Sequence, residues 1–132
     1  MESADPIVKA ILKSFIVIEE THTCELFFND NITITLDAII KVDKYCKQFT
    51  EGRRLKRLVV SGRNSHITRE ARIYGQETSE GNKAFIAAEA VVVYSFPQKM
   101  VANFYFAFLK GLYPTQFFTD IEKAREWLSK QE

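Results

Sequence analysis

The fold follows from residues 84–109, which read Ala84-Phe-Ile-Ala-Ala-Glu-Ala-Val-Val-Val-Tyr94 and then Ser95-Phe-Pro-Gln-Lys-Met-Val-Ala-Asn-Phe-Tyr-Phe-Ala-Phe-Leu109. The β-branched run from Val91 to Val93 indicates a strand that is covered on both faces. Pro97 suits the first turn of a helix, and the apolar residues after it predict a helix that ends at Lys110-Gly111. A buried strand, a short turn and an apolar helix make half of a βαβ unit.

The composition indicates one soluble domain spanning residues 1–132, in which residues 1–12 have no clear assignment. The chain has 18 Lys and Arg against 17 Asp and Glu, so a net charge of +1 gives no general attraction to nucleic acid or to membranes. Cys24 and Cys46 lack the spacing of a disulfide scaffold or a metal site, which favours a reducing compartment. With no signal peptide and no membrane-spanning window, we expect a cytoplasmic protein without membrane insertion.

The remaining residues alternate between strand and helix patterns. A hairpin over residues 15–28 precedes a helix that Thr35 caps, and that helix ends at Thr50-Glu-Gly52. The order β-β-α-β-α-β-α-β-α predicts a mixed sheet of four or five strands, flanked by four helices. The later elements are a strand at 55–60, a helix that starts near Ile67 and fades over 75–82, a strand at 114–118, and a last helix capped by Thr119.

This order and three motifs resemble the SpoIIAA-like (STAS-type) small bacterial proteins, especially an uncharacterised branch of them. The motifs are Ile34-Thr-Leu-Asp37, the run from Glu89 to Tyr105, and Phe118-Thr-Asp-Ile-Glu-Lys-Ala-Arg-Glu-Trp-Leu128. The resemblance implies an α/β domain of SpoIIAA-like fold. It also implies regulatory protein binding, as in anti-sigma-factor antagonists, or a ligand cavity, as in related lipid-carrying domains.

The resemblance also marks the turn after the third strand as the position of a phosphoswitch. In the best-understood relatives an Asp-Ser-Ser-Gly-like motif there carries a phosphorylated serine. This sequence instead reads Val60-Ser-Gly-Arg-Asn-Ser-His-Ile67, so the candidate residues are Ser61, Gly62, Arg63 and Ser65. A turn before a helix N-terminus in an arginine-rich stretch could hold an anion, but turn and capping chemistry explains both serines equally well.

Glu89 stands inside the buried strand, where an unpaired carboxylate is costly. One interpretation is a general base in a cavity, with Tyr94 or Tyr105 beside it. The other is a buried ion pair, with Arg72 or Lys99 as the partner, and the absence of a second catalytic group favours this pair.

The helix predicted at 97–109 carries aromatic residues around its circumference, although one helix face suffices to cover a sheet. We therefore expect a homodimer whose interface contains Phe104, Tyr105, Phe106 and Phe108.

No catalytic triad, phosphate-binding loop or metal set is recognisable, and His22 and His66 stand alone in separate turns. The sequence therefore predicts a non-enzymatic binding or regulatory module that acts through protein contacts, without cofactor, metal or specific nucleic acid. The alternatives are a carrier or sensor of a small apolar or anionic ligand and, third, an enzyme that uses Glu89.

Overall fold

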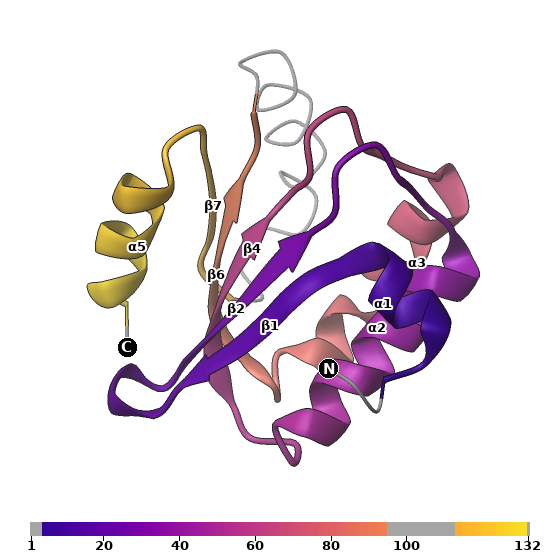
Figure 1. Cartoon of the computed structure of the whole chain (residues 1–132). Helices are drawn as coiled ribbons and strands as arrows, with labels where there is room; N and C mark the ends of the chain where they lie inside the picture. The colour runs from indigo at the N-terminus through magenta and orange to yellow at the C-terminus, as the bar shows by residue number, and fades with distance from the viewer. Residues whose placement is uncertain (1–3, 95–112, 132) are drawn as a thin grey trace.

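A computed structural model describes residues 4–94 and 113–131 of the chain. Its centre is a mixed five-stranded sheet in the order β1-β2-β4-β6-β7 (Figure 1). Strands β1 and β2 form the predicted antiparallel hairpin, and every other neighbouring pair is parallel. The strands are β1 Leu12–Ile18, β2 Thr23–Phe28, β4 Leu55–Val60, β6 Ile86–Val92 and β7 Thr115–Phe118.

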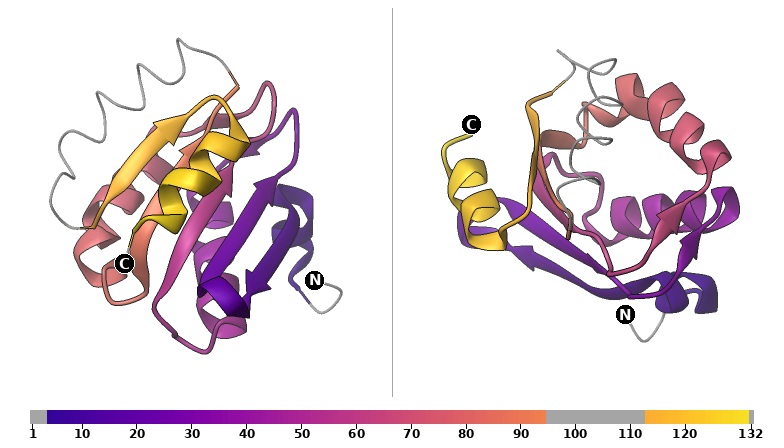
Figure 2. Two further views of the ribbon diagram at one scale, coloured as in Figure 1. Left: turned by 90° about the vertical axis from the view of Figure 1, so that its left-hand side faces the viewer. Right: turned by 90° about the horizontal axis from the view of Figure 1, so that it is seen from above.

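The described helices lie on both faces of this sheet, as the view from above shows (Figure 2). One face carries α2 and α3, and the opposite face carries α5. A separate two-residue ladder, β3 with β5, lies just before the starts of α2 and α3. The bounds are α1 Pro6–Ile11, α2 Leu36–Phe49, α3 Arg69–Asn82, α5 Ile121–Ser129, β3 Thr33–Ile34 and β5 His66–Ile67, with a 3₁₀ turn η1 at Glu19–Thr21.

The N-terminal segment, which the sequence left ambiguous, is a short helix followed directly by β1. The Asp5 carboxylate accepts a hydrogen bond of 2.8 Å from the Ile7 amide, and Pro6 occupies the first turn. Both features favour a helix start. Strand β1 consequently begins at Leu12, three residues before the predicted hairpin.

The predicted helix starts are confirmed at α2 and corrected at α3 and α5. Thr35 caps α2 as expected, accepting 3.2 Å from the Ala38 amide. Ile67 belongs to β5, so Thr68 caps α3 instead. The last cap is Asp120 rather than Thr119, because its carboxylate accepts from two amides of the first turn of α5.

Helix α3 is also longer than the sequence suggested. It continues through Gly75 and Gly81 to Asn82, although two glycines predict an early end. The helix expected at 97–109, with its four aromatic interface residues, lies outside the described residues.

The sheet separates two apolar cores. The first joins β1 and β2 to α1 and α2, and it includes Phe15, Leu26 and Val42. The second lies under α5 and includes Leu58, Ala90 and Leu128. Successive strand residues alternate between the two, as the period of two in a covered strand requires. None of the helices in the described part of the chain is long and apolar enough to cross a membrane.

Candidate functional site

The central polar feature is an ion pair between the middle strands of the sheet. Glu89 of β6 lies opposite Arg57 of β4 in the parallel register. Glu89 is buried, with 5% of its surface exposed. The guanidinium Nε donates to the Glu89 carboxylate oxygen Oε2, and Nη2 forms an ion-pair contact with the same oxygen. Because the flanking residues Ala88 and Ala90 pack under α5, this pair points to the opposite face, toward α2 and α3.

Glu89 is in a buried ion pair whose partner is Arg57 rather than Arg72. The sequence offered Arg72 or Lys99; Lys99 lies outside the described residues, and Arg72 lies near the exposed start of α3 and donates 2.8 Å to the Ile67 carbonyl. Arg57 is the partner because it occupies the neighbouring strand at the same level and on the same face. The parallel order of these two strands was predictable, but their register was not.

Tyr113 lies in the electrostatic field of this pair. The pKa of Tyr113 is raised to about 12, mainly by burial and then by the negative charge of Glu89, against a lowering effect of Arg57. Burial acts to lower the pKa of Arg57, but the charge of Glu89 and the neighbouring phenol and thiols outweigh it and raise the pKa. The guanidinium therefore stays charged, as an ion pair inside the fold requires.

A second polar cluster joins α2 to α3. The Asp43 carboxylate oxygen Oδ2 accepts 3.0 Å from Lys47 Nζ and 3.1 Å from the Tyr74 hydroxyl. Asp43 and Lys47 are one turn apart on α2, whereas Tyr74 belongs to α3. Burial raises the pKa of Tyr74, and the charge of Asp43 and the hydrogen bond to it act in the same direction. This cluster therefore fixes one helix against the other.

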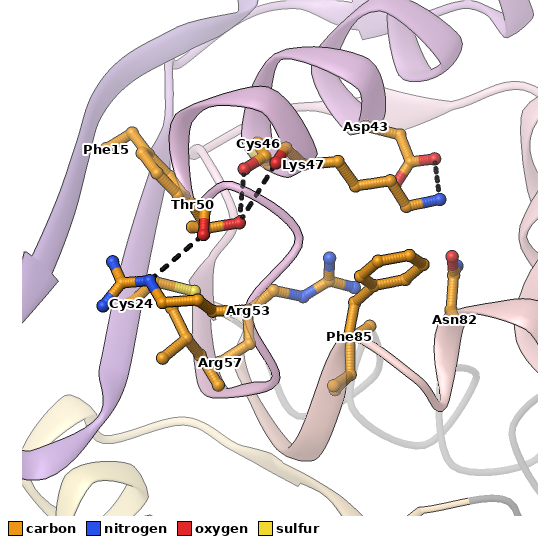
Figure 3. Close-up of a pocket in the computed structure, with 12 residues that line it drawn as sticks. Phe15, Cys24, Asp43, Cys46, Lys47, Thr50, Arg53, Arg57, Asn82 and Phe85 are labelled. Atoms are coloured by element: carbon orange, nitrogen blue, oxygen red, sulfur yellow. Dashed lines mark hydrogen bonds and ion pairs between the residues drawn. The ribbon is translucent and has the colours of Figure 1, made fainter.

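A small cavity lies between the sheet and α2 (Figure 3). Phe15 and the two cysteines lie toward one end, and Asp43, Asn82 and Phe85 toward the other. Its volume of about 30 Å³ accommodates one or two water molecules but no larger ligand. The lining consists of Phe15, Cys24, Asp43, Cys46, Lys47, Thr50, Arg53, Leu55, Arg57, Asn82, Phe85 and Ile86.

The two cysteines are buried thiols with little nucleophilic character. Burial raises the pKa of Cys24 to about 11 and that of Cys46 to about 12, and the positive charge of Arg57 only partly offsets it. Both thiols are therefore protonated at neutral pH, and a thiol is a far weaker nucleophile than a thiolate. No three His, Cys, Asp or Glu side chains come together as a possible metal site within the described ranges.

The candidate anion site, the turn after β4, is occupied by internal hydrogen bonds. The Ser61 hydroxyl donates 2.9 Å to the Val92 carbonyl, and the Ser65 hydroxyl donates 3.1 Å to the Asn29 carbonyl. The Arg63 amide donates 2.7 Å to the Asp30 carboxylate. The Asp30 carboxylate thus already accepts the hydrogen bond from the amide that would otherwise bind an external anion.

The same turn is packed tightly against the loop after β2. A Cβ atom built on Gly62 would lie 1.9 Å from the Asn29 carbonyl oxygen, so only glycine fits there. The Arg63 guanidinium lies over the Tyr94 ring, 4.3 Å from its centre. The turn also precedes α3 by several residues, because α3 starts at Arg69. It therefore does not place Ser61 or Ser65 at a helix N-terminus as the resemblance implied, and phosphorylation of either serine stays a prediction.

A second buried carboxylate was missed from the sequence. Glu25 of β2 faces α5, and its two oxygens accept 3.0 Å each from Nε and Nη2 of Arg125. The hairpin assignment placed Glu25 in a strand. Its partner lies 100 residues away along the chain, and no local pattern connects the two.

Large apolar side chains remain exposed where α2 begins. Leu36 and Ile40 are one turn apart and are 40% and 42% exposed. Ile67 is also exposed, and the β3–β5 ladder pairs it with Ile34, which precedes Leu36 by two residues. We name Leu36, Ile40 and Ile67 the α2–α3 patch.

Comparison with known proteins supports the fold assignment. Residues 25–132 match the model of a family described as "Domain of unknown function (DUF7793)". No curated protein matches the sequence significantly.

A solved structure with the same architecture is that of an uncharacterised protein from the DUF3478 family of Shewanella loihica PV-4, described as having a SpoIIAA-like fold. The two chains superpose with a TM-score of 0.63 at 13% identity, over 87% of this chain and 92% of the other. The predicted SpoIIAA-like α/β fold is therefore confirmed. An identity this low carries the fold alone.

Proposed function

Because the chain belongs to the DUF7793 family and has a SpoIIAA-like fold, we propose that it is a non-enzymatic regulatory module of STAS type, which acts in the cytoplasm by binding another protein. The proposal rests on how the described residues use their charges. The buried carboxylates of Glu25 and Glu89 are bonded to arginines, while the apolar side chains of the α2–α3 patch face solvent. These two buried carboxylates hold the fold together, whereas the apolar side chains of the patch are free to make contacts.

The third interpretation, an enzyme that uses Glu89, has weaker support. A general base must reach a substrate proton with a free lone pair. The Glu89 carboxylate is instead held in a buried ion pair with Arg57, and a substrate proton would have to compete with the nearby positive charge for it.

The carrier interpretation has weaker support for a different reason. A carried apolar molecule needs a pocket of about 300 Å³ or more. The cavity beside Arg57 is about a tenth of that size and carries three cationic side chains, those of Lys47, Arg53 and Arg57. The cavity formed by the described residues therefore has room for water beside these cations but not for a carried apolar molecule.

A site-specific photo-crosslinker at Ile40 tests the proposal in the cells that produce the protein. Ile40 is half-exposed in the α2–α3 patch, so a bound partner should form a covalent adduct of defined mass. The matched control is the same crosslinker at Lys123, an exposed position of α5 on the opposite face. We expect one adduct at Ile40, none at Lys123, and loss of the adduct when Leu36 is replaced by Asp.

Equal labelling at both positions, or none at Ile40, contradicts the proposed surface. Leu36→Asp places the new charge in solvent at the first residue of α2, where the helix dipole favours an acidic group. The fold should therefore be retained, and circular dichroism of the variant checks it.

A further inference from the structure

The outer side of β1 is an edge of the five-stranded sheet. In the part of the chain that the structure describes, β1 pairs with β2 and has no strand on its other side. Natural edge strands are usually protected against pairing by charges, by prolines or by a covering element. The one charged residue of β1 is Lys13, and it lies at the irregularity between Leu12 and Ser14, outside the regular part of the strand.

Large apolar side chains are exposed on both faces of this edge. On the α5 face, Ile16 is 47% exposed and lies next to Glu25 across the hairpin. On the α2 face, Phe49 is 49% exposed, and its ring packs edge-on against Phe15 with centres 5.2 Å apart. An unprotected edge with apolar groups above and below it is suited to pairing with another strand.

We propose that the β1 edge binds the β1 edge of a second copy of the chain, so that the two sheets continue into one another across a twofold axis. A twofold contact buries the same surface on both copies, so every favourable contact occurs twice. The surface differs from the α2–α3 patch, so this inference goes beyond the proposed function and can fail independently of it. It also differs from the interface expected at residues 97–109.

The register of this pairing follows from the strand itself. Regular pairing runs from Ser14 to Ile18, and its centre is Ile16. If the twofold axis is perpendicular to the sheet, the α5 faces of both copies lie on the same side of the joined sheet. Even-numbered residues of one β1 must then lie opposite even-numbered residues of the other, and odd opposite odd. Pairing about the centre then places Ile16 opposite the partner's Ile16, and Ser14 opposite the partner's Ile18.

The charges at the ends of the strand agree with this register. Lys13 lies just before the regular pairing and Glu19, the first residue of η1, lies just after it, so this register brings Lys13 near the partner's Glu19 at each end of the contact. Glu19 already accepts from Arg53, but its side chain is 64% exposed, so its carboxylate can accept a further donor. Opposite charges that meet at the ends of the contact favour this register over slipped ones. The matching charges and the exposed Ile16 together identify a second copy of the chain as the occupant.

Engineered cysteines test the register directly. In an antiparallel pair, opposed Cα atoms are about 4.5 to 5.5 Å apart, which suits a disulfide. Ile16→Cys should therefore form a disulfide-linked dimer under mild oxidation. Ile18→Cys alone should not, because its Cα lies roughly 13 Å from its own counterpart in the same register. A mixture of Ser14→Cys and Ile18→Cys should give the mixed dimer. The natural cysteines, Cys24 and Cys46, are buried, and the unmodified protein under the same oxidation measures any crosslinking that they cause.

Light scattering supplies the second measurement. The proposal predicts the mass of a dimer for the unmodified protein at about 100 micromolar, which corresponds to a dissociation constant below that concentration. Ile16→Lys should give a folded monomer, since the side chain is half-exposed and its replacement leaves the core intact. A monomeric unmodified protein overturns the inference, and so does a dimer in which Ile16→Cys and Ile18→Cys crosslink equally.

Discussion

Removal of the Glu89 carboxylate should be among the most destabilising charge substitutions in the described part of the fold. Glu89→Leu leaves the Arg57 guanidinium without its anion between sheet and helices, and breaking a buried pair in this way typically costs about 3 to 5 kcal/mol. Arg57 keeps 23% of its side-chain surface exposed, so water can partly solvate the orphaned charge. We therefore expect a loss of about 3 kcal/mol, at the lower end of that range.

The double-mutant cycle separates the pair from its individual members. Arg57→Met should also destabilise the fold, because it leaves the Glu89 carboxylate buried alone. Combining Arg57→Met with Glu89→Leu removes both charges and should restore most of the loss, because apolar residues of similar size replace buried ion pairs at little cost. Urea unfolding monitored by the fluorescence of Trp127, the single tryptophan, measures all four proteins.

An exposed pair at the end of α5 gives the control. Lys130 and Glu126 lie 3.4 Å apart, and their side chains are 71% and 69% exposed. Glu126→Leu should change the urea midpoint far less than Glu89→Leu, because solvent screens exposed pairs. The reasoning fails if the double variant loses as much stability as the two single variants added together, since the charges would then act independently.

Two further predictions concern the buried thiols and the tight turn after β4. Folding raises the pKa of Cys24 to about 11 and that of Cys46 to about 12 from an ordinary 9.0. The folded state therefore holds protons that the unfolded state loses above pH 9. Stability should be unaffected by these thiols below pH 9 and fall above it, by about 1 kcal/mol per thiol per pH unit until the folded pKa is reached. Urea unfolding at pH 8 and pH 10 measures the loss, which should shrink when both cysteines are replaced by Ala. Gly62→Ala should destabilise the protein by about 1 to 3 kcal/mol or more, because the new Cβ meets the Asn29 carbonyl oxygen at 1.9 Å. Gly75→Ala, in open space on α3, should instead stabilise it by about 0.5 to 1 kcal/mol, and equal midpoints for the two variants in urea would refute this reading of the turn.

The order of strands and helices was largely predictable because it depends on local patterns. The strands β2 and β4 and the cap at Thr35 are encoded within a few residues, and each was found where the sequence indicated. The boundaries that differed depend on longer-range contacts. Ile67 is a strand residue because β5 pairs with β3, and α3 passes through Gly75 although that glycine predicts a helix end.

The candidate site was less accessible from the sequence because its partners meet across the sheet. Glu89 was recognised as a buried carboxylate that needs a counterion, and this requirement is a local property of an apolar strand. Its pairing with Arg57 depends on strand register, and that of Glu25 with Arg125 depends on where α5 lies. Likewise, the hydrogen bonds of Ser61 and Ser65 join strand ends that are 31 and 36 residues apart along the chain.

Native mass spectrometry of freshly purified protein tests most directly whether the chain acts by binding a protein rather than by holding a small ligand. The account predicts the mass of the bare 15.3 kDa polypeptide, or a simple multiple of it, with no stoichiometric addition. A small molecule that stays bound in a one-to-one ratio, and that is lost in Arg57→Met but retained in Arg125→Met on the opposite face of the sheet, would contradict it.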